Sequence, residues 1–109
     1  MPAKPLDAIY RALSHPVRRD LVGRLSRVGD RGVRVTELAA PYAISLAAVS
    51  KHIRVLEDSG LVRRSIVGRD HFVALQPKRL DDAADWIARC QRFWTERLDR
   101  LETLLRDQK

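Results

Sequence analysis

The last thirty residues of the chain constrain its fold most strongly. From Lys78 to about Asp107 there is no glycine and no proline, and apolar residues recur every three or four positions. This spacing predicts one amphipathic helix of roughly 28 residues, about 40 Å long at 1.5 Å per residue. The core of a 109-residue chain is too small to cover the whole apolar stripe of such a helix. We therefore expect a homodimer, in which a second copy of the helix covers the stripe.

The predicted dimer interface is this apolar stripe of the last helix. Residues 6–13, which also show apolar side chains at helical spacing, are the second candidate for the same interface. The stripe consists of Leu80, Ala83, Ile87, Cys90, Trp94, Leu98, Leu101 and Leu105.

The beginning of the chain is expected to form two shorter helices. Apolar residues at helical spacing predict a first helix over Leu6–Ser14. His15 and Pro16 then break this helix and start another, because proline suits a first helical turn and cannot continue a preceding helix. His15 is expected to cap the second helix, whose apolar stripe ends at Val28 and which should itself end near Gly29.

A short strand and two more helices follow. Val33–Val35 has the β-branched character of a strand. Thr36 is expected to cap a helix over Glu37–Ala40, and Ser45 to cap a longer one that ends at Ser59-Gly60. A side-chain oxygen before the first turn and a glycine after the last are common helix boundaries. The buried stripe of the longer helix should consist of Leu46, Val49, Ile53 and Leu56.

A β-hairpin is predicted after these helices. Leu61–Val67 and Asp70–Leu75 are rich in β-branched residues, and Gly68-Arg69 between them is typical of a tight turn. The predicted order is therefore α-α-β-α-α-β-β-α. The expected fold is mainly α with a small β-hairpin, in a single domain over residues 1–109.

The middle of the chain has the spacing of a winged helix-turn-helix. A short helix, a tight turn at Ala43-Ile44 and a second helix from Ser45 are followed at once by the basic hairpin. Small residues on the outer face of the second helix would let its backbone approach base edges, while cations and hydroxyls suit phosphate oxygens. We expect residues 6–76 to form the DNA-binding region and residues 78–107 the dimerisation helix. The candidate DNA-binding residues are Ser45, Ala47, Ala48, Ser50, Lys51, His52, Arg54, Arg63, Arg64 and Arg69.

Two stretches of this region resemble a known protein family. Residues 44–62, ISLAAVSKHIRVLEDSGLV, look like the recognition helix and strand entry of the ArsR/SmtB family of bacterial repressors. Residues 12–19, ALSHPVRR, are similar to the opening helix break of that family, and Gly68-Arg69 falls where its wing turn lies. The resemblance implies a homodimeric transcriptional regulator, usually a repressor released by an inducer. Two recognition helices related by a two-fold axis would then bind an inverted-repeat operator in double-stranded DNA.

The sequence departs from the metal-sensing members of that family. Their arsenic and cadmium sites place a Cys-x-Cys pair on the first helix of the helix-turn-helix, but residues 35–41 contain no cysteine. Their zinc site on the last helix needs histidine, and residues 80–109 contain none. His15, His52 and His71 show no spacing that converges on a metal. We therefore expect no metal site of these types and no cofactor, and the inducer stays unknown.

The charge is unevenly distributed along the chain. Residues 1–79 have a net charge of +8 and residues 80–109 a net charge of −1, so binding to a polyanion would belong to the first part. A solvated, arginine-rich surface is the alternative explanation of this charge. No apolar run is long enough to span a membrane, and Met1–Pro5 lacks the features of a signal peptide. These features predict a cytoplasmic protein, and no arrangement of nucleophiles, carboxylates or phosphate loops indicates an enzyme.

Several residues have two interpretations. His52 is expected to contact DNA, with packing against a neighbouring group as the alternative, while His71 should face solvent on the wing. Cys90 is interpreted as a small apolar residue of the stripe rather than a redox sensor. Trp86, Phe93 and Trp94 are interpreted as dimer core rather than a ligand pocket. For the whole chain, the alternatives to a specific regulator are a winged-helix adaptor that binds an acidic protein and a non-specific nucleoid protein.

Overall fold

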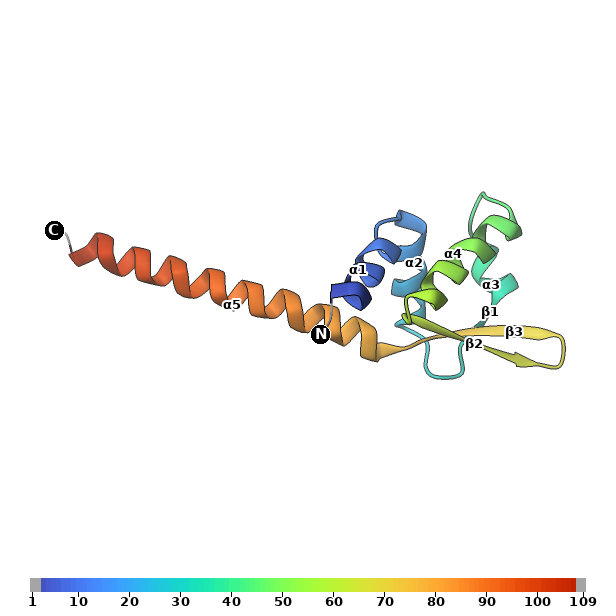
Figure 1. Ribbon diagram of the computed structural model, residues 1–109. Coiled ribbons are helices and arrows are strands. Elements are labelled where there is room, and N and C mark those ends of the chain that lie inside the picture. Colours follow the sequence, from blue (N-terminus) through green and yellow to red (C-terminus); the bar gives the residue numbers. More distant parts are fainter. Residues whose placement is uncertain (1–2, 108–109) are drawn as a thin grey trace.

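The elements follow the α-α-β-α-α-β-β-α order predicted from the sequence (Figure 1). The computed structural model describes residues 3–107, so Met1 and Pro2, part of the segment on which the expectation about secretion rests, lie outside the described residues. The elements are α1 (Ala3–Ala12), α2 (Pro16–Leu25), β1 (Val33–Arg34), α3 (Val35–Ala39), α4 (Leu46–Asp58), β2 (Val62–Val67), β3 (Asp70–Leu75) and α5 (Pro77–Asp107).

The three strands form one small antiparallel sheet with the order β1-β3-β2. β2 and β3 pair along their whole length, from Val62 opposite Leu75 to Val67 opposite Asp70. Gly68 has a φ of +64° in the turn between them, a conformation that glycine adopts without strain. The predicted hairpin is confirmed, and it projects beyond the helices as a two-stranded wing (Figure 1).

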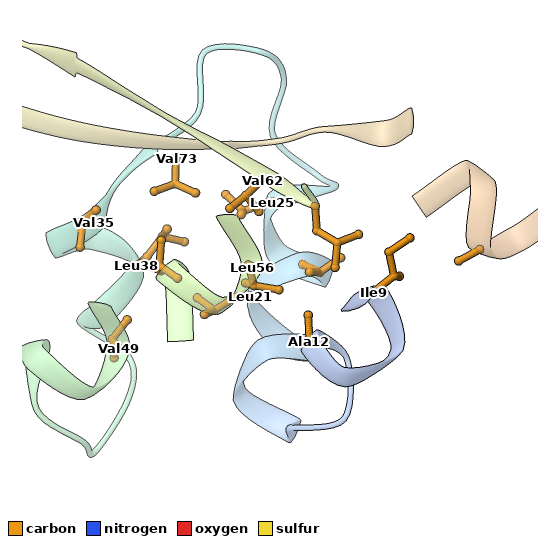
Figure 2. Packing of buried hydrophobic residues seen from close by; sticks show 14 residues of the cluster. Ile9, Ala12, Leu21, Leu25, Val35, Leu38, Val49, Leu56, Val62 and Val73 are labelled. Atoms are coloured by element: carbon orange, nitrogen blue, oxygen red, sulfur yellow. The ribbon is translucent and has the colours of Figure 1, made fainter. Parts of the chain in front are cut away.

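Helix α4 lies at the centre of the hydrophobic core. Val49, Ile53 and Leu56 are almost completely buried, as the helical spacing predicts. They pack among apolar side chains from α1, α2, α3 and the sheet, including Leu21 and Val73 (Figure 2). This packing fixes which face of α4 turns outward.

The long helix α5 packs against the core only at its beginning. Ala83 is 4% exposed and belongs to the core cluster, while Leu80 packs against that cluster. The rings of Tyr10 on α1 and Trp86 on α5 meet edge to face, with centroids 5.9 Å apart. After this contact α5 leaves the rest of the molecule, which gives the chain its longest dimension of 71 Å (Figure 1).

The sequence analysis predicted that Leu46 belongs to the buried stripe of α4, and this prediction is wrong. The Leu46 side chain is 51% exposed. Leu46 is the first residue of the helix, and helical side chains lean toward the helix N-terminus. Its side chain therefore lies beyond the end of the core, where it lines a small pocket of about 240 Å³ between the starts of α3 and α4 and the wing.

The start of α3 and the end of α2 also differ from the prediction. α3 begins at Val35, and its N-cap residue, Arg34, makes no capping hydrogen bond, so Thr36 lies inside the first turn instead of capping it. Val35 is buried, which favours turning the chain inward directly after β1. α2 ends at Leu25 with Ser26 as its C-cap, and Val28 is exposed beyond this end. The Oγ of Ser26 donates a hydrogen bond to the carbonyl oxygen of Gly23, which satisfies a backbone group of the last turn.

Candidate nucleic-acid interface

Helices α3 and α4 form the helix-turn-helix, and the start of α4 is fixed by a side-chain cap. The Oγ of Ser45 accepts a hydrogen bond from the backbone N–H of Ala48 at 3.1 Å, as expected for an N-cap serine. At the other end the helix stops at Asp58, and Gly60 follows with a φ of +81°. Both predicted boundaries of this helix are confirmed.

The outer face of α4 is basic, and its side chains near the start of the helix are small. Ala47, Lys51 and Arg54 are exposed, and Ser50 is half-buried between this face and the core. These four residues line one side of a groove of about 770 Å³, whose other side is formed by Arg64 and His71 of the wing. The groove therefore combines small residues, a hydroxyl group and cations, which suit base edges and phosphates, with the carboxylates of Glu57 and Asp58 near the end of α4.

The wing contributes arginines with different surroundings. Arg69 lies at the exposed tip, next to Gly68 in the turn. Arg63 is also exposed, and its Nη2 donates a hydrogen bond to the carbonyl oxygen of Asp30 at 3.2 Å. Arg64 is half-buried and forms an ion pair with Glu57 of α4, with Nη2 and Oε1 2.8 Å apart. Sequence spacing gives no indication of this ion pair, because it joins a helix to a strand across the turn.

The side chain of His52 is held in place by Arg18 and His15. Arg18 of α2 donates from Nη1 to Nδ1 of His52 at 3.1 Å, and the His15 ring lies 4.3 Å from the His52 ring, centroid to centroid. Burial, followed by His15 and Arg18, lowers the pKa of His52 below its ordinary value, which favours the neutral ring. Only Nε2 of His52 is thus left for a contact with DNA.

The other two histidines lie where the sequence analysis placed them. The Nδ1 of His15 accepts a hydrogen bond from the backbone N–H of Val17 at 3.1 Å, so His15 caps α2 as predicted. His71 is exposed on β3, with its Nδ1 3.3 Å from Nη1 of Arg64.

A polar cluster that the sequence analysis missed holds the turn of the helix-turn-helix. The Tyr42 hydroxyl donates a hydrogen bond to Asp20 of α2, and the Arg24 guanidinium lies 5.5 Å from the centre of the Tyr42 ring. Arg24 also donates to the carbonyl oxygen of Leu38 at 2.9 Å. Burial and the hydrogen bond to Asp20 raise the pKa of Tyr42. Since Asp20 and Tyr42 are 22 residues apart, no local pattern connects them.

The comparisons with known proteins agree with this arrangement. Residues 13–65 match a family model described as a helix-turn-helix domain. The crystal structure of an ArsR family transcriptional regulator is 36% identical, with a TM-score of 0.79 over 87% of this chain and 95% of the other. A possible transcriptional regulator for arsenical resistance is 35% identical, with a TM-score of 0.65 over 84% and 88%. The chain belongs to the ArsR family of transcriptional regulators.

A more distant solved structure shares the fold of this ArsR family member. It is the homodimeric winged helix-turn-helix DNA-binding domain of Mb0332 from Mycobacterium bovis, which is 19% identical with a TM-score of 0.63. The match covers 90% of this chain and 85% of the other. Comparison with curated protein sequences finds no match. The chain is thus a DNA-binding regulator with the winged helix-turn-helix fold that its sequence predicts.

No cluster that could hold a metal ion is found among residues 3–107, where no three His, Cys, Asp or Glu side chains come together suitably. Cys90 is a free, exposed thiol on α5 rather than a buried side chain of the single chain. Within the same residues, no helix combines the length and the apolar character needed to cross a membrane.

The predicted dimer stripe of α5 divides into two parts in this ArsR family chain. Ala83 and Leu80 pack against the core of their own chain. Beyond them, the large apolar residues of the stripe are between 43% and 61% exposed, namely Ile87, Trp94, Leu98, Leu101 and Leu105. Phe93 and Leu104 are exposed beside them. The surface available to a second copy therefore begins near Ile87.

Proposed function

We propose that this regulator is a cytoplasmic homodimeric repressor that binds an inverted-repeat operator. The observation that supports this most directly is the orientation of α4. Its apolar side is buried in the core, and its opposite side presents Ala47, Lys51 and Arg54 to solvent beside the groove of the wing. A helix exposed in this way fits the major groove, where small side chains permit close approach and cations reach phosphates or guanine.

Within this proposal the candidate residues have distinct roles. The hydroxyl of Ser45 caps α4 and so orients its first turn. Ala47 and Ala48 belong to this turn, and their small side chains would pack against base edges. Ser50, Lys51 and Arg54 extend along the same helix toward phosphates. Arg63 and Arg69 of the wing would contact the adjacent backbone or minor groove.

The dimer is proposed from the exposed stripe of α5. An apolar surface that runs from Ile87 to Leu105 is larger than the isolated apolar residues common on soluble proteins. Packing two copies of α5 against each other would cover it and relate the two α4 helices by a two-fold axis. The recognition helices would then meet successive major grooves, about 34 Å apart.

Selection of bound fragments from the host genome tests this proposal. The purified protein is incubated with sheared genomic DNA, and the retained fragments are sequenced and footprinted. The proposal predicts a small set of promoter fragments that share an inverted repeat with half-sites about one helical turn apart. Retention of fragments without a common sequence would indicate a nucleoid protein, and no retention would indicate an adaptor for another protein. Repeating the selection with candidate effectors would identify the inducer.

A further inference from the structure

Arg64 is bound on every nitrogen of its guanidinium group. Nε and Nη2 both donate to Oε1 of Glu57, at 3.0 and 2.8 Å, and Nη1 lies 3.3 Å from Nδ1 of His71. The two side chains of the ion pair are only 24% and 29% exposed. This environment differs from that of Arg69 and Lys51, which are exposed and take part in no ion pair among the described residues.

The three partners come from three different elements. Arg64 lies on β2, His71 on β3 and Glu57 in the last turn of α4. The ion pair therefore joins the recognition helix to the wing, and both of its residues line the groove between these two elements. Two hydrogen bonds from the planar guanidinium of Arg64 to the carboxylate of Glu57 restrain the relative orientation of the two side chains, and therefore of β2 and α4.

We propose that Arg64 is a positioning residue that acts through Glu57, and that their ion pair sets the position of the wing relative to α4 on DNA. This inference rests on the proposed DNA-binding function and changes the role expected for Arg64, which sequence analysis grouped with the phosphate contacts. Glu57 cancels the charge of Arg64, so the pair adds no net positive charge to the binding face. Arg64 consequently adds nothing to the release of counterions, on which salt-dependent affinity depends.

The substitution Glu57→Gln distinguishes the two roles by the sign of its effect. If Arg64 contacts a phosphate, removal of the neighbouring negative charge releases the arginine and increases affinity for DNA. If the ion pair positions the wing, the same substitution loosens the wing, and affinity for the operator should fall by about tenfold. Asp58→Asn is the matched control, because Asp58 lines the same groove and forms no ion pair among the described residues. Asp58→Asn removes the same negative charge as Glu57→Gln, and its affinity for the operator should be equal to that of the wild type or slightly higher.

Substitutions of Arg64 provide the second test, with Arg69 as the matched arginine. Arg64→Lys keeps the charge but loses the fork, so it should weaken binding about tenfold without changing the slope of log affinity against log salt. Arg69→Lys should bind like the wild type. The double variant Glu57→Gln/Arg64→Ala removes both charges of the pair together and should also leave the slope unchanged, whereas Arg69→Ala should reduce it by about 1. Thermal unfolding followed by circular dichroism establishes that each variant is folded, and Arg64→Lys retains most of the packing of the native side chain.

These measurements separate failure of the inference from failure of the proposed function. Operator affinities are measured by fluorescence anisotropy at several salt concentrations, with the fragment that the wild-type protein selects. Specific binding by the wild type, together with a Glu57→Gln variant that binds as tightly as Asp58→Asn, would overturn the inference alone. A reduced slope for the double variant Glu57→Gln/Arg64→Ala would overturn it as well. Equal binding of all duplexes by the wild type would overturn the proposed function itself.

Discussion

The imidazole rings of His15 and His52 pack against each other where α2 meets α4, with centroids 4.3 Å apart and planes inclined by 41°. Arg18 binds the Nδ1 of His52 at 3.1 Å and also donates to the carbonyl oxygen of Ala12 at 2.6 Å. The flank of the recognition helix is thus attached to the corner between α1 and α2. A proton on Nδ1 of His52 would break the bond to Arg18 and place two cations together.

This arrangement makes the stability of the protein depend on pH. Since the pKa of His52 is lowered in the folded chain, the unfolded chain binds a proton more readily. The free energy of unfolding should therefore be highest above the ordinary histidine pKa and should fall as pH decreases through that pKa toward the lower pKa of the folded chain. His52→Gln, which retains an acceptor for Arg18, should reduce this dependence. Urea unfolding across the pH range measures it, and an identical pH dependence in both proteins would refute the explanation.

Loss of a cation from the outer face of α4 should weaken DNA binding in a salt-dependent manner. Lys51→Ala and Arg54→Ala each remove an exposed charge, so each should lower affinity and reduce the salt slope by about 0.9. Arg92→Ala removes an exposed arginine from α5 and is the matched control, with no expected effect. Gel-shift titrations at several salt concentrations provide the slopes. Unchanged affinity for both α4 variants would exclude them from the interface.

A charge in the exposed stripe of α5 should prevent dimer formation without unfolding the chain. Leu101 is 53% exposed in the single chain, so Leu101→Glu costs little there but would bury a carboxylate in the dimer. Sedimentation should show a shift from about twice 12.5 kDa to 12.5 kDa, with loss of operator binding. Thr95→Glu, which introduces the same charge at another exposed position of α5, should stay dimeric. A wild-type protein that sediments as a monomer would contradict the dimer.

Truncation of a core residue on α4 should reduce stability strongly. Ile53 is 1% exposed and packs among helices and sheet, so Ile53→Ala should lower the free energy of unfolding by about 2–5 kcal/mol. Lys51→Ala, two residues earlier on the exposed face, should change it by no more than about 0.5 kcal/mol. Urea denaturation of the two variants compares them. Similar losses of stability would mean that the assignment of the two faces is wrong.

The sequence predicted those elements whose cause is local. Gly68 between β-branched runs predicted the wing, and Ser45 with Gly60 predicted both ends of α4. Leu46 fits the same helical period as Val49 and Ile53, but it lies at the helix start, where no core remains to cover it. Periodicity describes direction around a helix and does not tell how far the core extends along it.

The sequence pattern did not predict contacts between residues that are far apart in the chain. The role of Arg64 depends on Glu57 across the α4–β2 turn, and a run of basic residues on the wing gives no sign that one of them is neutralised. The hydrogen bond between Tyr42 and Asp20 likewise depends on how α2 packs beside the turn. The folded structure is therefore needed to distinguish exposed cations, which are available to bind DNA, from cations that form ion pairs within the chain.

The ratio of affinities for a selected promoter fragment and for random duplex tests the central claim most directly. Both are measured with the wild-type protein at physiological salt, by competition on one labelled fragment. A sequence-specific regulator should prefer its site by about a thousandfold or more. A ratio near one would mean that the basic face of α4 attracts DNA without reading its sequence, and would contradict the account.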